Sequence, residues 1–154
     1  MQRRITGFVR DEHGDWVASL DCGHRQHVRH DPPFKSRPWV VSAEGRADRV
    51  GKEWPCPLCD RFEMPSDFVA YKRTPEFTEA TVPQGLRRDH STKPGVWAKI
   101  RVFEGKLRYH VPSLDKTFDV TPETPGIVIA EVLHHVEPLG QVRFYVEFFR
   151  APTT

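Results

Sequence analysis

Three cysteines and a nearby histidine have the residue types and spacing of a zinc site. Cys56 and Cys59 form a CxxC pair, and such a turn directs two thiolates toward one point. Cys22 and His24 add a third thiol and an imidazole, because residues i and i+2 of an extended segment face the same side. A structural zinc takes four ligands of these kinds in a tetrahedron. The sequence therefore predicts Zn²⁺ held by Cys22, His24, Cys56 and Cys59.

Alternatives to this ligand set remain open. His27 and His30 follow closely, and His27 takes the place of His24 if the chain turns after Gly23. The CxxC pair could also be a redox pair, but a redox motif normally opens a helix after a strand, whereas this one follows Trp54-Pro55. In a third interpretation the cysteines are buried thiols without a metal.

A second group of metal ligands lies nearer the end of the chain. Glu147 shares one face of the apolar run 142–149 with two aromatic residues, where a carboxylate is costly unless it is paired or binds a metal. Only one of His134 and His135 can face it, because adjacent strand residues point opposite ways. One of these two histidines, together with His90 and Glu147, would form a facial triad of metal ligands. Such a triad indicates a second divalent metal: Fe²⁺, Zn²⁺ or Mn²⁺.

In a plainer interpretation His90 hydrogen-bonds to a turn and Glu147 pairs with Arg101 or Arg143. A lone histidine on such a strand is more often structural than a ligand.

The elements that must position these residues are short strands. Gly and Pro punctuate apolar runs along the whole chain, and no long helical period is visible. Ile5–Val9 and Trp16–Leu20 read as a hairpin, and so do Val96–Phe103 and Lys106–Val111. Residues 39–41 are a further strand candidate. The fold class predicted is mainly β.

A junction is expected between two domains. Every cysteine precedes Asp60, and the long alternating patterns follow Tyr71. We expect a small zinc-ribbon-like (zinc-knuckle) domain at residues 1–62 and a β-barrel at residues 71–154.

Composition limits the classes of function. The net charge is only +2, with no dense run of Lys and Arg, which argues against nucleic-acid binding. No apolar stretch is long enough to span a membrane, and the N-terminus lacks the apolar core of a secretory signal, so we expect a cytoplasmic protein without a membrane partner. In that reducing compartment an odd number of cysteines favours metal ligation over disulfides.

The first part resembles a small bacterial family of domains with no established activity. The resemblance rests on segments that keep the family's order: Gly14–Leu20, Cys22–His30, Pro32-Pro33, Arg37–Val40 and Cys56–Cys59. It implies a zinc-ribbon-like domain.

The second part resembles the TehB/YeaR-like family, which is associated with tellurite resistance and nitrogen-oxide responses. The resemblance lies in Arg73–Leu86, Arg87–Tyr109, Leu133–Pro138 and Arg143–Phe149. It implies a cupin-type barrel, that is, a double-stranded β-helix, and it aligns His134 rather than His135 with the barrel histidine. Ordinary cupins carry two histidines and a glutamate in their first motif, where this chain has only His90.

Together these observations predict a metal-binding cupin protein with an N-terminal structural zinc. Its function would be metal-dependent chemistry on, or response to, a small molecule or oxyanion of the tellurite, oxidative or nitrosative stress type. No nucleophile, general base or cofactor fingerprint identifies a reaction, so whether it is an enzyme stays open, as does a homodimer formed through the barrel. The alternatives are a non-catalytic metal- or oxyanion-binding stress protein and a zinc domain that recruits another protein.

Overall fold

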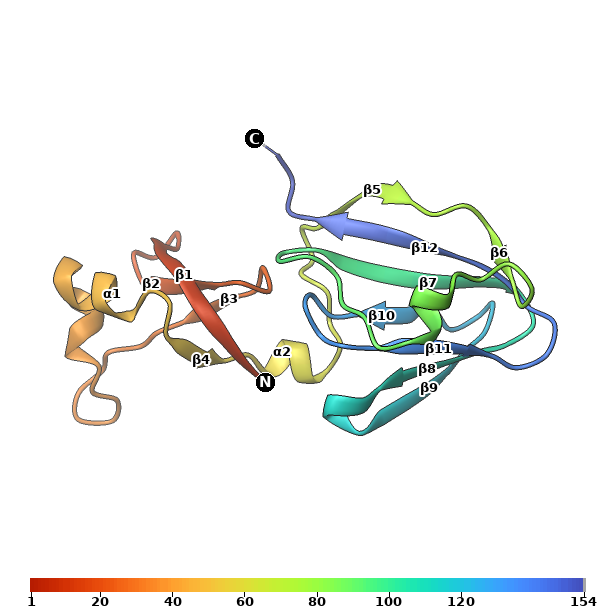
Figure 1. Ribbon diagram of the computed structural model, residues 1–154. Helices are drawn as coiled ribbons and strands as arrows, with labels where there is room; N and C mark the ends of the chain where they lie inside the picture. Colours follow the sequence, from red (N-terminus) through yellow and green to blue (C-terminus); the bar gives the residue numbers. More distant parts are fainter. Residues whose placement is uncertain (154) are drawn as a thin grey trace. The chain divides into compact units, whose positions relative to one another are not determined.

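The computed structural model describes residues 1–153 and is mainly β. The chain divides into two compact units, Met1–Arg61 and Phe62–Thr154. Figure 1 shows the strands and short helices of each unit.

The first unit is a small antiparallel sheet with short helical segments. The strand order is β3-β2-β1-β4. The strands are β1 (Gln2–Arg10), β2 (Trp16–Leu20), β3 (Arg25–His27) and β4 (Glu53–Pro55). The helical segments are the 3-10 helix η1 (Pro38–Val41), α1 (Ala43–Arg49) and α2 (Pro57–Asp60).

The predicted first hairpin is confirmed. β1 and β2 pair from Ile5 opposite Leu20 to Arg10 opposite Trp16. Asp11 holds the turn between them, because its carboxylate accepts hydrogen bonds from the backbone N–H groups of His13 and Asp15. The expected strand at residues 39–41 is wrong: a proline at its start favours a helical first turn, and the segment is the helix η1.

The interior of the first unit contains few large apolar side chains. The buried hydrophobic residues other than cysteine are Ile5, Val17, Ala18, Leu20, Val28 and Val40. A domain this small rarely gains enough free energy of folding from such a core alone. The three cysteine side chains, all fully buried, fill much of the remaining interior.

The second unit consists of two sheets. One has the order β10-β7-β12-β5, with β6 also paired to β12, and the other has the order β11-β8-β9. The first comprises β5 (Val69–Arg73), β6 (Phe77–Thr78), β7 (Trp97–Glu104), β10 (Gly126–Val128) and β12 (Arg143–Arg150). The second comprises β8 (Leu107–Val111), β9 (Lys116–Val120) and β11 (His135–Pro138). Two 3-10 helices complete the unit, η2 (Gln84–Arg87) and η3 (Pro112–Leu114).

The predicted hairpin between residues 96–103 and 106–111 is wrong. β7 and β8 are the expected strands, but they belong to different sheets, so the chain crosses from one sheet to the other at Gly105. This glycine has φ +79°, and a Cβ there would lie 2.0 Å from the carbonyl oxygen of Gln141. The glycine is therefore needed for a close backbone crossing, which in sequence looks the same as a tight turn.

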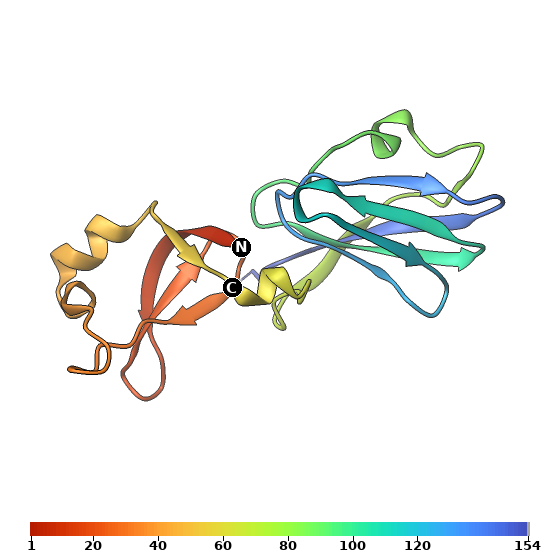
Figure 2. The same cartoon turned by 90° about the horizontal axis from the view of Figure 1, so that it is seen from below.

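The two sheets of the second unit enclose a continuous apolar core. Figure 2 shows its strands curling around a common interior. Ile100 and Phe144 come from the first sheet, and Leu107, Tyr109 and Val136 come from the second. No helix within residues 1–153 has the length and apolar character needed to cross a membrane.

Because this core lies entirely within Phe62–Thr154, we predict that a fragment of residues 62–154 folds alone. Its circular dichroism should be strand-type and its thermal unfolding cooperative. An aggregated or unfolded fragment would show that the first unit is needed to complete the core.

Candidate metal centre and cavity

The four residues predicted to bind zinc meet at one buried point. The ligand atoms of Cys22, His24, Cys56 and Cys59 all lie within 4.8 Å of one another. Nδ1 of His24 is 3.3 Å from the Sγ atoms of Cys22 and Cys56 and 3.6 Å from that of Cys59. The Sγ atoms of Cys22 and Cys56 are 3.9 Å apart.

These distances suit a tetrahedral metal ion. Bond lengths of about 2.3 Å for zinc to sulfur and about 2.0 Å for zinc to nitrogen place the ligand atoms of a tetrahedron roughly 3.5–3.8 Å apart. The separation of the Cys22 and Cys56 sulfurs is far too long for a disulfide, which needs about 2.05 Å. The donor set therefore fits zinc.

A tight turn, rather than an extended segment, brings Cys22 and His24 together. The backbone N–H of Gly23 donates to the carbonyl of Leu20, and Gly23 adopts φ +93°. Cys22 and His24 do lie together as expected, but the expected i, i+2 alternation is not what aligns them. Gly23 instead folds the link between β2 and β3 so that both side chains point inward.

Cys56 and Cys59 lie at the junction of a strand and a helix. Cys56 directly follows β4 and is the N-cap of α2, which contains Cys59. The sequence argument against a redox pair was therefore wrong in its premise, since the CxxC pair does open a helix after a strand. The third thiol and the imidazole at the same point favour a metal instead.

Interactions within the cluster favour a thiolate at Cys56 but oppose one at Cys59. Hydrogen bonds from Cys22 and Cys59 lower the pKa of the Cys56 thiol, whereas interactions with Cys22 and Cys56, together with burial, raise the pKa of Cys59. Burial opposes the charge on His24, but hydrogen bonds and charge from Cys22 and Cys56 outweigh it and raise the pKa of His24 to about 9. The amide of Gln26 donates to Cys56 Sγ at 3.7 Å. A cluster that stabilises negative sulfur is prepared for a cation.

Arg3 contributes a positive charge beside the cluster. Its Nε donates to Asp21 at 2.8 Å, and its side chain is only 6% exposed. Burial works against this charge, yet Asp21 and the cysteines outweigh burial and raise the pKa of Arg3. Three thiolates and one Zn²⁺ carry a net charge of −1, so an arginine here would stabilise the metal-bound form.

The competing histidines are engaged elsewhere. His27 pairs with Asp11, with Nε2 and Oδ2 3.0 Å apart, and its side chain is 58% exposed. His30 Nδ1 accepts a hydrogen bond from the backbone N–H of Arg37. His24 alone among the three contributes to the buried cluster.

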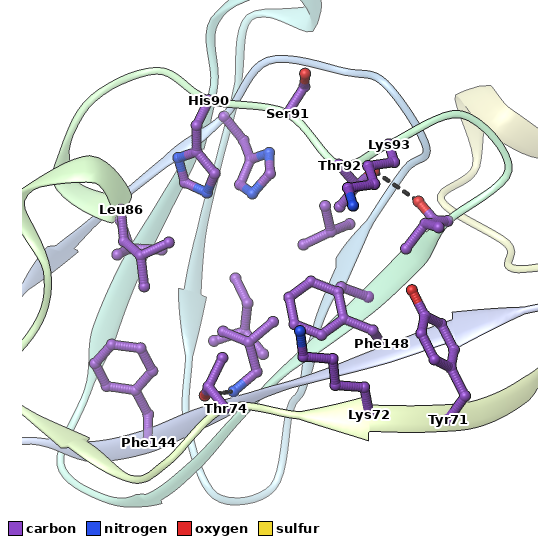
Figure 3. A pocket seen from close by; sticks show the side chains of 17 residues that line it. Tyr71, Lys72, Thr74, Leu86, His90, Ser91, Thr92, Lys93, Phe144 and Phe148 are labelled. Atoms are coloured by element: carbon purple, nitrogen blue, oxygen red, sulfur yellow. Dashed lines mark hydrogen bonds between the residues drawn. The ribbon is translucent and has the colours of Figure 1, made fainter.

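The second unit contains a largely apolar cavity of about 270 Å³. Its apolar wall comes from both sheets and includes Ile100, Val128, Val136, Phe144, Val146 and Phe148. Figure 3 shows the opening, with His90 and Leu86 on one side and Tyr71, Lys72 and Phe148 on another. A concave apolar site with a few converging polar groups is the usual form of a small-molecule site.

His90 and His134 meet at the edge of this cavity. Their backbones form an antiparallel bridge with two hydrogen bonds of 2.9 Å, and their rings are 4.1 Å apart. Val136 also lines the cavity, whereas His135 turns away and pairs with Asp89 at 2.6 Å. Of the two adjacent histidines, His134 is the one that reaches the interior.

Backbone carbonyls fix the tautomer of both rings. Nδ1 of His90 lies 2.9 Å from the carbonyl oxygen of Arg88, and Nδ1 of His134 lies 3.0 Å from that of Val132. A carbonyl only accepts, so each Nδ1 carries a proton, and Nε2 is the nitrogen that has the lone pair in the neutral ring. Burial lowers the pKa of His134 to about 4, which keeps that ring neutral. Both rings can thus bind a metal or accept a hydrogen bond through Nε2.

The structure does not bring Glu147 to these histidines. The cavity-lining side chains of β12 are Phe144, Val146 and Phe148, so Glu147 lies on the opposite face of the strand. Its carboxylate accepts from Nε of Arg101 at 3.1 Å across the sheet. The sequence analysis assigned the wrong face of this strand to the interior, because both faces carry aromatic residues.

Sequence reasoning missed two lysines that line the cavity. Lys72 extends from β5, and Lys93 lies in the loop before β7. Isolated lysines in short exposed segments carry no spacing signal, so only the fold brings them together.

Two family models match the chain, one to each unit. Residues 6–63 match the family described as "Protein of unknown function (DUF3565)", and residues 72–146 match the TehB-like domain. The first match contains all four residues of the Cys/His cluster, and the second contains His90 and His134. The resemblance of the second part to TehB and YeaR is confirmed.

Individual relatives resemble the second part. The chain is 34% identical over 84 residues to the probable S-adenosyl-L-methionine-dependent methyltransferase TehB of Haemophilus influenzae, covering 50% of this chain but only 29% of TehB. It is 24% identical over 100 residues to the uncharacterized protein YeaR of Escherichia coli, covering 58% of this chain and 84% of YeaR. This chain therefore spans less than a third of the length of TehB.

Solved structures support the fold of the second part. A crystal structure of an Escherichia coli protein matches with a TM-score of 0.54 at 24% identity, covering 59% of this chain and 98% of that one. The crystal structure of TehB from Haemophilus influenzae matches with a TM-score of 0.51 at 28% identity, covering 56% of this chain and 32% of that one.

For the cluster, we predict that Cys56→Ser and His24→Ala each weaken zinc binding by more than about 100-fold. Mutation of a residue that only hydrogen-bonds to a metal ligand already lowers metal affinity about 10–100-fold, and loss of a ligand itself should cost more. Because zinc binding contributes to folding, both variants should also lower the unfolding temperature of the first unit. Competition with a zinc chelator measures the affinity.

His27→Ala is the matched control, since it removes a nearby exposed histidine and should leave zinc affinity unchanged. If His27→Ala loses zinc and His24→Ala retains it, the fourth ligand is His27.

Proposed function

We propose that the protein is a metal-binding protein in which a structural zinc organises the first unit and the second unit binds a small molecule. The observation that carries the zinc assignment is the convergence of three sulfurs and one imidazole nitrogen within 4.8 Å. The first unit would then be a zinc-ribbon-like domain, with two ligands from a turn and two from a CxxC knuckle.

The proposed zinc is structural rather than catalytic. Catalytic zinc sites keep one position for water or substrate, whereas here four protein ligands complete the tetrahedron. All four residues are buried, with at most 4% exposure. A closed, buried site supplies folding energy and offers no position at which a substrate could bind.

For the second unit we propose a cupin-type barrel whose cavity holds a second divalent metal at His90 and His134. Two histidines whose Nδ1–H groups donate to backbone carbonyls support this, because metal-binding histidines commonly donate the other ring N–H to a carbonyl. Fe²⁺, Zn²⁺ and Mn²⁺ all accept imidazole, and a two-histidine site would leave several positions for water or ligand. Those positions are where chemistry on a small molecule would occur.

The similarity to TehB supports a role in the response to an oxyanion or to oxidative or nitrosative stress. The methyltransferase named for TehB is a much longer protein, so its activity is not assigned to this chain. A non-catalytic protein that senses or sequesters the same small molecule is the alternative, favoured by the absence of a carboxylate among the described side chains that line the cavity, since no third protein ligand then accompanies His90 and His134.

We predict that the full chain, already loaded with zinc in its first unit, takes up a second equivalent of metal. His90→Ala and His134→Ala should abolish this uptake. Glu147→Gln should leave it unchanged, since Glu147 lies on the other face and its partly exposed ion pair contributes at most about 1 kcal/mol to stability. Equilibrium dialysis against Fe²⁺ under anaerobic conditions, followed by metal analysis, measures the stoichiometry.

If the wild type takes up no second metal, the proposed metal in the cavity is wrong and the non-catalytic alternative remains. If Glu147→Gln loses the second metal, Glu147 is a metal ligand together with the two histidines. That result would contradict the placement of Glu147 on the face of β12 away from the cavity.

A further inference from the structure

The charged side chains that form the wall of the cavity in the second unit are all of one sign. The described residues that line it include Lys72 and Lys93 but no aspartate or glutamate. Both lysines are exposed, so they lie at the mouth rather than in the apolar interior. Figure 3 shows Lys72 and Lys93 on different sides of the opening. Two ammonium groups without a carboxylate in the same wall create a positive potential at the entrance.

Beyond the mouth, the wall offers few hydrogen-bond donors. The hydroxyl of Thr74 donates to the carbonyl of Pro75, and that of Thr92 donates to the carbonyl of Val96. The rest of the interior is formed by aliphatic and phenyl groups such as Ile100, Val146 and Phe148. An inorganic oxyanion placed there would lose its hydration without replacement, at a cost of several kcal/mol or more.

We propose that this cavity is a binding site for a small organic carboxylate with an apolar body. The inference rests on the proposed small-molecule role of the second unit and specifies its ligand class. The carboxylate would lie at the mouth between Lys72 and Lys93, and the apolar body would fill the space lined by Ile100 and Phe144. Where no metal is bound, the Nε2 atoms of His90 and His134 are hydrogen-bond acceptors, which a carboxylate avoids, so they face the ligand's uncharged part.

The size of the cavity limits the ligand further. A volume of about 270 Å³ corresponds to roughly nine water molecules, so the ligand has on the order of ten non-hydrogen atoms. Benzoate and hexanoate have this size and chemistry, and they serve as probes. Their neutral counterparts benzamide and hexanamide keep the shape without the charge, and inorganic phosphate keeps a charge without the apolar body.

The test is calorimetric titration of the zinc-loaded full chain with each probe. Benzoate or hexanoate should bind, the amides should bind at least about tenfold more weakly, and phosphate should bind weakest, because a charge-assisted hydrogen bond is stronger than a neutral one and the interior repels a bare oxyanion. Lys72→Gln and Lys93→Gln should each weaken benzoate about tenfold. Lys106→Gln is the control, since this exposed lysine is not part of the cavity wall.

Phosphate binding as tight as benzoate binding would overturn the inference, as would equal binding of acid and amide or no carboxylate binding in the millimolar range. Repeating the titration with His134→Ala separates this inference from the proposed second metal. If His134→Ala still binds the carboxylate, the proposed ligand class stands even if the proposed second metal is wrong. If the wild type takes up the second metal but binds no carboxylate, only the proposed ligand class is wrong.

Discussion

Three thiols and an imidazole converge at one buried point of a unit whose apolar core is small. Apart from the cysteines, the buried apolar residues of Met1–Arg61 are three valines, one isoleucine, one leucine and one alanine. Their burial gives a weak hydrophobic contribution for a domain of this size. A cation at the cysteines would join the β2–β3 turn to the end of β4, which are far apart in sequence. The sheet order β3-β2-β1-β4 is consistent with such a link across β1.

The second unit is stabilised differently. Its core includes Ile100, Tyr109 and Phe144, large side chains that are each almost completely buried. Its apolar interior is not completely filled, and the space left between the sheets is the cavity. The backbone orders the polar groups at the cavity edge. Reciprocal backbone hydrogen bonds between His90 and His134 hold the two residues side by side, and a backbone carbonyl accepts a hydrogen bond from Nδ1 of each ring. One chain thus combines a unit with a buried Cys/His cluster and a unit with an apolar cavity.

The sequence was most informative where chemistry and spacing coincide. Cys22, His24, Cys56 and Cys59 could be chosen because few other arrangements place soft ligands at such short spacings, and the structure brings together all four. Strand positions such as β7 and β8 could also be expected from alternation. The sheet to which each strand belongs could not, because a crossing at Gly105 and a hairpin turn use the same residues.

Glu147 shows the limit of reasoning from periodicity. A period of two separates the faces of β12 but does not say which face is interior, and Tyr145 and Phe149 made the wrong face look apolar. The deciding residue is Arg101 on the neighbouring strand, one of the two arginines that the plainer interpretation offered as partners of Glu147, and the choice between them requires the register of β7 and β12. The lysines at the cavity mouth were missed for a similar reason, since their convergence depends on the fold of two distant segments.

The account depends most on a metal held by three sulfurs and one nitrogen, and X-ray absorption at the zinc edge measures this directly. On full-length protein containing one equivalent of zinc, the account predicts three sulfur scatterers at about 2.3 Å and one nitrogen at about 2.0 Å. A zinc coordinated by fewer than three sulfurs, or mainly by oxygen and nitrogen, would contradict it.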